Sequence, residues 1–284
     1  MSTTVRLATA EDDIRLRNFT RSEQMEGRID LAISFGYEAS AQTVIAERDG
    51  RLVGCGRREV RERFVNGKPP QPVAYLSGMR FCDSDKRAIV RGYGLLRELH
   101  ETDGRPVTFT SVMADNWPAL SMFSQPREGL PSYERLSDYV THVIASRNLA
   151  RIHEVFWNAC YARQSKWSGS DANSFQFTRR PGPLTLPAKD LIVRRYCGLL
   201  RLLQRWLPAV DKRLPIGCIT MAGAFKLDAA LAEVVTEGWT HVLFGAPRAT
   251  GWGIKLRSRL FAVRWPGDEW KLDGRPVWPE VADL

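Results

Sequence analysis

The sequence has no long hydrophobic run, few histidines and no paired cysteines. No apolar segment approaches the roughly 18 residues that suggest a membrane-spanning helix, and residues 1–19 lack the apolar core of a signal peptide. The five cysteines are scattered without the spacing of a zinc or redox site: Cys55, Cys82, Cys160, Cys197 and Cys218. We therefore expect a cytoplasmic protein with reduced thiols, in which each cysteine is a small core residue.

The sequence also lacks the motifs of several enzyme classes. The four histidines have no Cys or carboxylate partners at metal-ligand spacing, so no metal site is expected. The chain has no nucleophile elbow, no Ser-His-Asp order and no P-loop. What remains is an ordinary globular composition, 44% hydrophobic and 26% charged, over 284 residues. That length is enough for two modest domains.

The stretch from Pro72 to His100 is the most informative. Residues 73–81 alternate as a strand does and end at Met79-Arg80-Phe81, and polar residues follow at 83–87. Gly92 and Gly94 then precede leucines at helical spacing. A glycine-bearing turn that leads into a helix exposes unpaired backbone N–H groups, which bind phosphate.

The flanking segments extend this pattern. Residues 43–56 form two β-branched runs around Asp49-Gly50, which predicts a hairpin. Residues 107–112 predict a strand that ends near Asn116, and a helix is expected from Trp117 to Phe123. The expected order is hairpin, strand, glycine turn, helix, strand, helix.

This order resembles the coenzyme-binding core of the GNAT superfamily, the acyl-CoA-dependent N-acyltransferases, over roughly residues 1–145. The resemblance implies an α/β fold with a GNAT-like mixed central sheet flanked by helices. It implies acetyl-CoA or another acyl-CoA as the donor, with its pyrophosphate on an Arg/Gln-x-x-Gly-x-Gly/Ala loop, and no metal. Arg87 and Gly92 match the first and last positions of residues 87–92, whereas Val90 replaces the middle glycine.

The resemblance also assigns cofactor-binding residues. The thioester carbonyl would be held by backbone N–H groups of Met79, Arg80 and Phe81. The pyrophosphate would be surrounded by Arg87, Val90, Arg91, Gly92, Tyr93 and Gly94. The later helix would contribute Asn116 and Phe123. Asn116 and Ala119 keep the Asn-x-x-Ala spacing of the family.

Three residues are the main candidates for proton transfer, and two others are weaker ones. Glu47 lies at the end of its strand and could be the general base, although a solvated hairpin residue opposing Arg51 explains it equally well; Glu59 and Asp115 are weaker candidates. Ser77 lies on the central strand, where other GNAT proteins often place a base. GNAT enzymes frequently carry a tyrosine seven residues after the Asn116 position; Phe123 stands there instead, and Tyr133 ranks first among its replacements.

The function implied is transfer of an acetyl or longer acyl group from a thioester to a primary amine of a small molecule or peptide. The alternative is a non-catalytic acyl-CoA-binding sensor or scaffold, because the tyrosine hydroxyl and the middle glycine are missing. The net charge of +9 suits an anionic acyl-CoA or an acidic acyl-carrier protein as donor. Solvated arginines from a biased composition are the simpler cause, and the absence of a basic cluster with interleaved aromatics argues against nucleic acid.

The second half repeats the order of the first with weaker detail. A Ser/Gly/Pro-containing stretch at 165–187 separates a helical pattern at 150–163 from an amphipathic pattern at 191–206. Strands at 216–221, 240–244 and 259–265, a short turn at 222–226 and a helix at 227–237 follow. We expect tandem domains, a GNAT-like acyl-CoA-binding domain at 1–147 and a degenerate GNAT-like domain without a phosphate loop at 148–284. An unrelated α/β extension is the alternative.

Overall fold

The computed structural model describes most of the first half of the chain and parts of the second. The described residues are 3–22, 29–33, 35–63, 71–81, 86–125, 127–148, 150–152, 154, 175–176, 185–187, 191–196, 205, 213–214, 216–219, 241–246, 254–271 and 277–278. None of the helices formed by these residues is long and apolar enough to cross a membrane.

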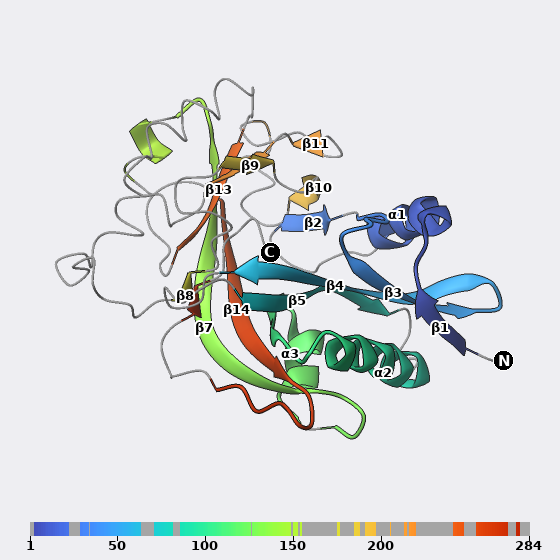
Figure 1. Ribbon diagram of the computed structural model, residues 1–284. Helices are drawn as coiled ribbons and strands as arrows, with labels where there is room; N and C mark the ends of the chain where they lie inside the picture. The colour runs from blue at the N-terminus through green and yellow to red at the C-terminus, as the bar shows by residue number, and fades with distance from the viewer. Residues whose placement is uncertain are drawn as a thin grey trace.

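The first half alternates strands and helices (Figure 1). Its elements are β1 (Thr3–Leu7), η1 (Ala10–Asp12), α1 (Asp13–Ser22), β2 (Ile29–Ile33), β3 (Gln42–Arg48), β4 (Arg51–Arg63), β5 (Gln71–Phe81), α2 (Lys86–Thr102), β6 (Val107–Met113), α3 (Trp117–Phe123) and β7 (Ser132–Ala145). The expected order of hairpin, strand, helix, strand and helix is confirmed as β3–β4, β5, α2, β6 and α3.

The described part of the second half consists mainly of strands. They are β8 (Phe175–Gln176), β9 (Thr185–Pro187), β10 (Leu191–Tyr196), β11 (Arg213–Leu214), β12 (Ile216–Ile219), β13 (His241–Ala246), β14 (Ile254–Arg264) and β15 (Val277–Trp278). The three strands expected here are confirmed as β12, β13 and β14 with shifted ends. The amphipathic segment 191–206 begins as strand β10. The expected turn at 222–226 and helix at 227–237, and most of the helix at 150–163, lie outside the described residues.

The β3–β4 connection shows why the local sequence folds as expected. Arg48 lies opposite Arg51, so only Asp49 and Gly50 form the turn. Their φ angles are 49° and 74°, the positive values that a two-residue turn compatible with strand twist requires. Asp and Gly tolerate this conformation better than other residues, which is why the Asp-Gly pair predicts the hairpin.

One ten-stranded sheet dominates the molecule, in the order β1-β3-β4-β5-β6-β14-β7-β13-β12-β9. Strands β5 and β6 are parallel, as are β12 and β13, and the other neighbours are antiparallel. Strands β11, β10 and β2 form a small separate sheet, so β10 of the second half pairs with β2 of the first. The expected mixed sheet with flanking helices is confirmed.

Helices cover both faces of the sheet, because neighbouring residues of a strand point to opposite sides. Val44 packs in a buried cluster with Tyr93 and Leu96 of α2. Ile45 packs in another cluster with Leu16 of α1. Helices α2 and α3 thus lie on one face and α1 on the other (Figure 1). We call these the α2 face and the α1 face.

The expected boundary between residues 147 and 148 does not divide the sheet. Strand β14 comes from the second half of the sequence but lies between β6 and β7 of the first half. It supplies buried core residues, including Leu260, Phe261 and Val263. The first 147 residues therefore do not form a complete sheet, and a clean tandem division at this boundary is wrong. That the second half is itself GNAT-like remains a prediction.

Candidate functional site

The parallel strands β5 and β6 pair along only part of their length. Residues 73–76 lie opposite residues 107–110, and the pairing ends there. Beyond this point β6 continues along β14 to Met113, while β5 continues along β4 to Phe81. The strands therefore separate after Leu76 and Thr110, and we call this point the fork. Among the described strands, none pairs with residues 77–81 on the edge that faces β6.

A β-bulge lies on β5 just past the fork. Ser77 is opposite Arg57 but Arg80 is opposite Cys55, so β5 has one extra residue between these pairs. Gly78 has a φ of 61°, and a Cβ atom there would lie 2.5 Å from the ring of Phe35. Both observations require glycine. The bulge breaks the regular ladder and changes the direction of the backbone that follows it.

The bulge places Met79, Arg80 and Phe81, the predicted thioester-binding residues, directly beyond the fork. Their side chains are held away from the strand edge. A Cβ atom on Gly56 would lie 2.2 Å from the Met79 sulfur, and one on Gly54 would lie 2.4 Å from the Phe81 ring. Arg80 donates a hydrogen bond to the carbonyl of Thr20. The backbone of this segment is therefore what the fork can offer to a ligand.

The predicted phosphate turn needs a correction. Helix α2 begins at Lys86, so Arg87 lies in its first turn, and Val90, Arg91, Gly92, Tyr93 and Gly94 lie within the helix rather than in a loop before it. Gly92 is buried, and a Cβ atom there would lie 3.9 Å from the Phe81 ring. Arg91 donates to the carbonyl of Thr3. Residues 82–85, which join β5 to α2, are outside the described residues.

The reason for this correction is the helical packing of α2. Ala88, Gly92, Tyr93, Leu96 and His100 are all buried, a spacing that places them on one side of the helix. This apolar stripe extends back before the two glycines, so packing against the sheet outweighs their low helix propensity. In the sequence, the small apolar residue Ala88, four residues before Gly92, was the signal that helix α2 starts before the glycines.

Tyr133 and Phe123 lie together. Their rings stack with centroids 3.8 Å apart and an interplanar angle of 10°. The Tyr133 hydroxyl donates to the Tyr93 hydroxyl at 2.7 Å. Burial raises the pKa of Tyr93 to about 12 and raises that of Tyr133 well above its ordinary value. Both phenols are therefore protonated at neutral pH, next to the ring that replaces the family's tyrosine.

Asn116 caps helix α3. Its side-chain oxygen accepts a hydrogen bond from the backbone N–H of Ala119 at 3.3 Å, and Pro118 occupies the first turn. Capping thus explains the asparagine of the Asn-x-x-Ala spacing but not the alanine, which contributes only its backbone N–H. The cofactor-binding role of Asn116 remains a prediction. Trp117, the first residue of α3, is 68% exposed.

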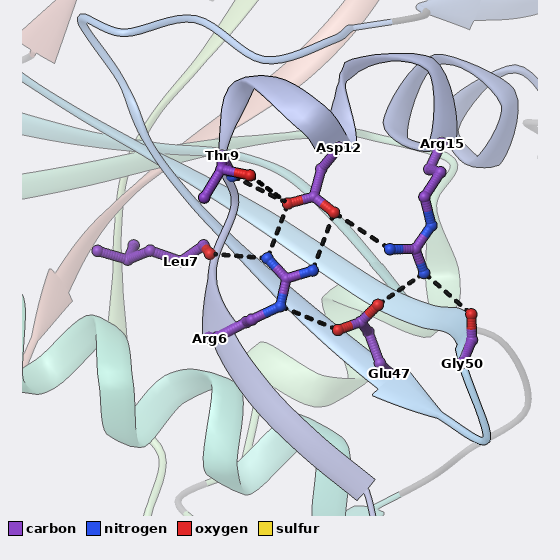
Figure 2. Close-up of polar contacts among 7 residues, drawn as sticks. All are labelled: Arg6, Leu7, Thr9, Asp12, Arg15, Glu47 and Gly50. Atoms are coloured by element: carbon purple, nitrogen blue, oxygen red, sulfur yellow. Dashed lines mark hydrogen bonds and ion pairs between the residues drawn. The ribbon is translucent and has the colours of Figure 1, made fainter.

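Glu47 lies on β3, the second strand from the β1 edge of the sheet, within a closed ionic network (Figure 2). One carboxylate oxygen accepts from Arg6 at 3.0 Å and the other from Arg15 at 2.6 Å. The same guanidinium groups bind Asp12, at the start of α1. Burial would raise the pKa of Glu47, but the two arginines outweigh it and hold the pKa below its usual value. This network ties α1 and β1 to β3 and leaves neither oxygen of Glu47 without a donor.

A second ionic cluster lies closer to the fork and includes Glu59, one of the weaker base candidates. Glu59 on β4 is opposite Tyr75, and Arg57 is opposite Ser77. Arg57 and Glu59 are both 5% exposed, with Nε and Oε1 2.8 Å apart, and Arg61 also binds Glu59. No hydrogen bond from the described groups reaches Oε1. Pairing residues 51–63 with residues 71–81 as antiparallel neighbours would have placed Glu59 beside the fork.

Hydroxyl groups line the α1 face on the other side of the fork. Tyr75 and Ser111 hydrogen-bond across from β5 to β6. Tyr139 of β7 hydrogen-bonds both Ser111 and Ser258 of β14, and burial raises its pKa to about 12. Ser77 lies half-buried on β5 beside this group, next to the bulge. No motif marked Ser111, Tyr139 or Ser258 because three distant strands contribute them.

The charged and polar groups near the fork do not form a metal centre. Within the described part of the chain, no group of His, Cys, Asp and Glu side chains could hold a metal ion.

Comparison with known proteins gives only distant likenesses. No family model matches the chain, and no curated protein matches it. An N-acetyltransferase from Staphylococcus aureus Mu50 is 9% identical with a TM-score of 0.37, and the match covers 49% of this chain and 85% of that one. A GNAT-family acetyltransferase from Streptococcus pneumoniae is 11% identical with a TM-score of 0.36, covering 48% and 87%.

A third solved structure matches over both halves. This conserved protein of unknown function from Enterococcus faecalis V583 is 9% identical with a TM-score of 0.39, covering 92% of this chain and 72% of that one. Likenesses at these identities and TM-scores support no statement about activity. By its own element order, fork and bulge, the described core has the mixed α/β arrangement expected from the GNAT resemblance.

Proposed function

We propose that the protein is an acyl-CoA-dependent N-acyltransferase that moves an acetyl or longer acyl group to a primary amine. The observation that carries the proposal is the fork between β5 and β6 with a glycine bulge immediately beyond it. A strand edge that has no ladder partner among the described strands can accept a linear thioester arm between two strands, and backbone N–H groups on that edge can bind the thioester carbonyl.

The coenzyme's pyrophosphate would bind at the N-terminus of α2. This helix starts at Lys86, shortly after β5 ends at Phe81, so its positive end lies near the outer end of the bulged strand. Arg87 adds a guanidinium in the first turn, and the first turn has no acidic residue. Gly92 and Gly94 would support the packing of α2 rather than contact phosphate themselves.

The reaction would use backbone and side chains together. The amine nitrogen attacks the thioester carbonyl carbon, a C–N bond forms, and the C–S bond breaks to release the coenzyme thiolate. Alignment of the two reactants makes this step effectively unimolecular, a contribution of roughly 7 to 11 kcal/mol. Backbone N–H groups of the segment Met79, Arg80 and Phe81 that face the fork would stabilise the negative charge that develops on the carbonyl oxygen.

Glu59 replaces Glu47 as our choice of general base. It lies on β4 opposite Tyr75, next to the fork, with Arg57 2.8 Å from one carboxylate oxygen and Arg61 bound to the other. Glu47 is also held by two arginines but lies one strand further from the fork. The amine's proton would pass to Glu59 through water, with Ser77 lining the path.

Tyr133 stays our choice of proton donor to the departing thiolate, acting together with Tyr93. The two hydroxyl groups share a hydrogen bond, and the Tyr133 ring lies on Phe123, the position where the family's tyrosine is expected. Their raised pKa values keep both phenols protonated, so they can donate but not act as bases near neutral pH.

Binding of the coenzyme is tested with a charge reversal at the start of α2. Arg87→Glu should weaken calorimetric affinity for coenzyme A by about tenfold to a hundredfold, because charged hydrogen bonds contribute roughly 1.5–3 kcal/mol. Arg97→Glu is the matched control. Arg97 is exposed on the same helix and pairs with Glu101, toward the other end.

The control should retain affinity, since the positive helix end does not extend to it. Equal losses in both variants would show a general charge effect and contradict the site. Binding of coenzyme A without turnover for any amine would favour the sensor alternative over the enzyme.

A further inference from the structure

Two side-chain hydrogen bonds cross from β6 to β5 where their pairing ends. Leu76 and Thr110 are the last paired residues. The Thr110 hydroxyl donates to the Leu76 carbonyl at 2.9 Å. On the opposite face, the hydroxyl of Tyr75 bonds that of Ser111. The fork is therefore held from both sides of the sheet by adjacent residues of β6.

The β6 side of this arrangement is firmly supported. Thr110 is buried, and β6 remains paired with β14 through Ser111 and beyond. Tyr139 of β7 also hydrogen-bonds Ser111. Since β14 and β7 pair along nearly their whole length, the two hydroxyls of β6 rest on a rigid base. The end of β5, which among the described strands pairs only with β4, is the part that these bonds restrain.

The Thr110 bond has a specific consequence for the backbone. A buried carbonyl requires a hydrogen-bond donor, and at the end of a ladder that donor is missing unless a side chain provides it. Thr110 provides it from the partner residue itself. The ladder can then end at Leu76 without an unsatisfied buried carbonyl, and the next residues of β5 can leave β6.

We propose that Thr110, Ser111 and Tyr75 are positioning residues that fix where β5 and β6 separate, and so direct the N–H groups of β5 residues 79–81 that face the fork toward the thioester carbonyl. This inference rests on the proposed function. It assigns the three side chains no contact with the reacting atoms. They act through the β5 backbone, by holding the last paired residue at a constant distance from the bulge.

Thr110→Val tests the central bond with the side-chain shape retained. We expect kcat for acyl transfer to fall by about tenfold to a hundredfold, because a misplacement of about 1 Å can cost 10²-fold in rate. The KM for acetyl-CoA should change little, because the α2 end of the coenzyme site is untouched. Thr110→Ser keeps the hydroxyl and should restore most of kcat.

Thr108→Val is the matched control. Thr108 lies two residues earlier on the same strand, is fully buried, and uses its hydroxyl to bond Pro106 and His100 rather than β5. This variant should lose stability without losing kcat. A similar loss of kcat in both valine variants, or an unchanged kcat in Thr110→Val, would overturn the proposal.

Amide hydrogen exchange in the full-length protein gives a readout that needs no activity. Thr110→Val should speed exchange in residues 77–81 while leaving α2 unchanged, and Thr108→Val should not affect 77–81. If the wild-type protein has no transferase activity, the proposed function fails, but faster exchange at 77–81 still supports the positioning claim. Unchanged exchange there in folded Thr110→Val contradicts it.

Discussion

At the residue scale, two carboxylates on neighbouring strands have different surroundings. Both carboxylate oxygens of Glu47 on β3 accept hydrogen bonds, one from Arg6 of β1 and the other from Arg15 of α1 (Figure 2). Glu59 on β4 is more deeply buried and lies opposite Tyr75 at the fork. Residue type alone cannot separate these two, because each is a glutamate within an alternating strand. Position in the sheet is the reason that we propose Glu59 rather than Glu47 as the base.

The two substitutions to glutamine should therefore have different effects. Glu59→Gln should lower kcat by about 10² to 10³-fold, within the range of general base catalysis. The acid side of its pH–rate profile should then reflect only protonation of the amine. Glu47→Gln should lower the melting temperature, since it removes a partner of two arginines, and leave kcat nearly unchanged. Steady-state kinetics of the two variants decides which glutamate is the base. Calorimetric affinity for the coenzyme checks that each variant is folded.

A loss of kcat in Glu47→Gln with kcat retained in Glu59→Gln would restore Glu47 as the base.

In the same assay, Tyr133→Phe should lower kcat by about tenfold to a hundredfold with coenzyme affinity retained, because the hydroxyl and not the ring is removed. An unchanged rate in this variant would show that water, rather than the tyrosine pair, protonates the thiolate.

The sequence located much of this residue set but not its arrangement. Ser77 and residues 79–81 are placed correctly at the end of the central strand because alternation predicts strands well. The bulge at Gly78 is not visible in the sequence, since its glycine is required by the Phe35 ring from a distant segment. Ser111 and Tyr139 have partners only once the strands are paired.

At the element scale, the C-terminal end of α2 contains a buried ionisable pair. His100 Nε2 lies 2.8 Å from Asp268 Oδ1, and both side chains are fully buried. Its Nδ1 lies 3.3 Å from the Thr108 hydroxyl. Burial lowers the pKa of His100, and Asp268 opposes this only in part, while Arg58 and Arg105 add to the lowering. The imidazole is therefore held neutral rather than as the cation that a helix C-terminus favours.

This lowered pKa predicts a loss of stability in mild acid. Between the folded pKa and the unfolded value of about 6.5, the unfolded chain binds more protons than the folded one. Stability from His100 is thus fully present above about pH 6.5 and declines as the pH falls below it. Urea unfolding of the wild type from pH 8 to pH 5 should show this decline, and His100→Gln should show a smaller one. A wild-type free energy of unfolding that stays constant over this range would contradict the prediction.

Elements differ in how far local sequence decides them. The β3–β4 hairpin follows from Asp49-Gly50 because its turn needs two positive φ angles. The start of α2 does not follow from Gly92 and Gly94, because burial of one helix side outweighs glycine's local preference. Strand β10 has an amphipathic pattern that also suits a helix, and its pairing with β2 decides the outcome.

At the scale of the whole molecule, the second half completes the first. Strand β14 lies between β6 and β7, and β10 pairs with β2 beside α1. Linear order suggested two separate domains because nothing local marks a strand that returns to an earlier sheet. The described structure instead makes the β6 side of the fork depend on β14. Because β10 pairs with β2, we propose that the second half also forms one side of the site that binds the amine acceptor.

The most direct test is turnover by the full-length protein. Acetyl-CoA and longer acyl-CoAs are incubated with a panel of primary amines, and both thiol release and the mass of the acylated amine are measured. We predict thiol release faster than in the absence of protein, matched by an equal amount of N-acylated product for at least one amine. Thiol release without acylated amine would indicate thioester hydrolysis instead. Coenzyme binding with no release for any donor and amine would contradict the account and leave an acyl-CoA-binding protein.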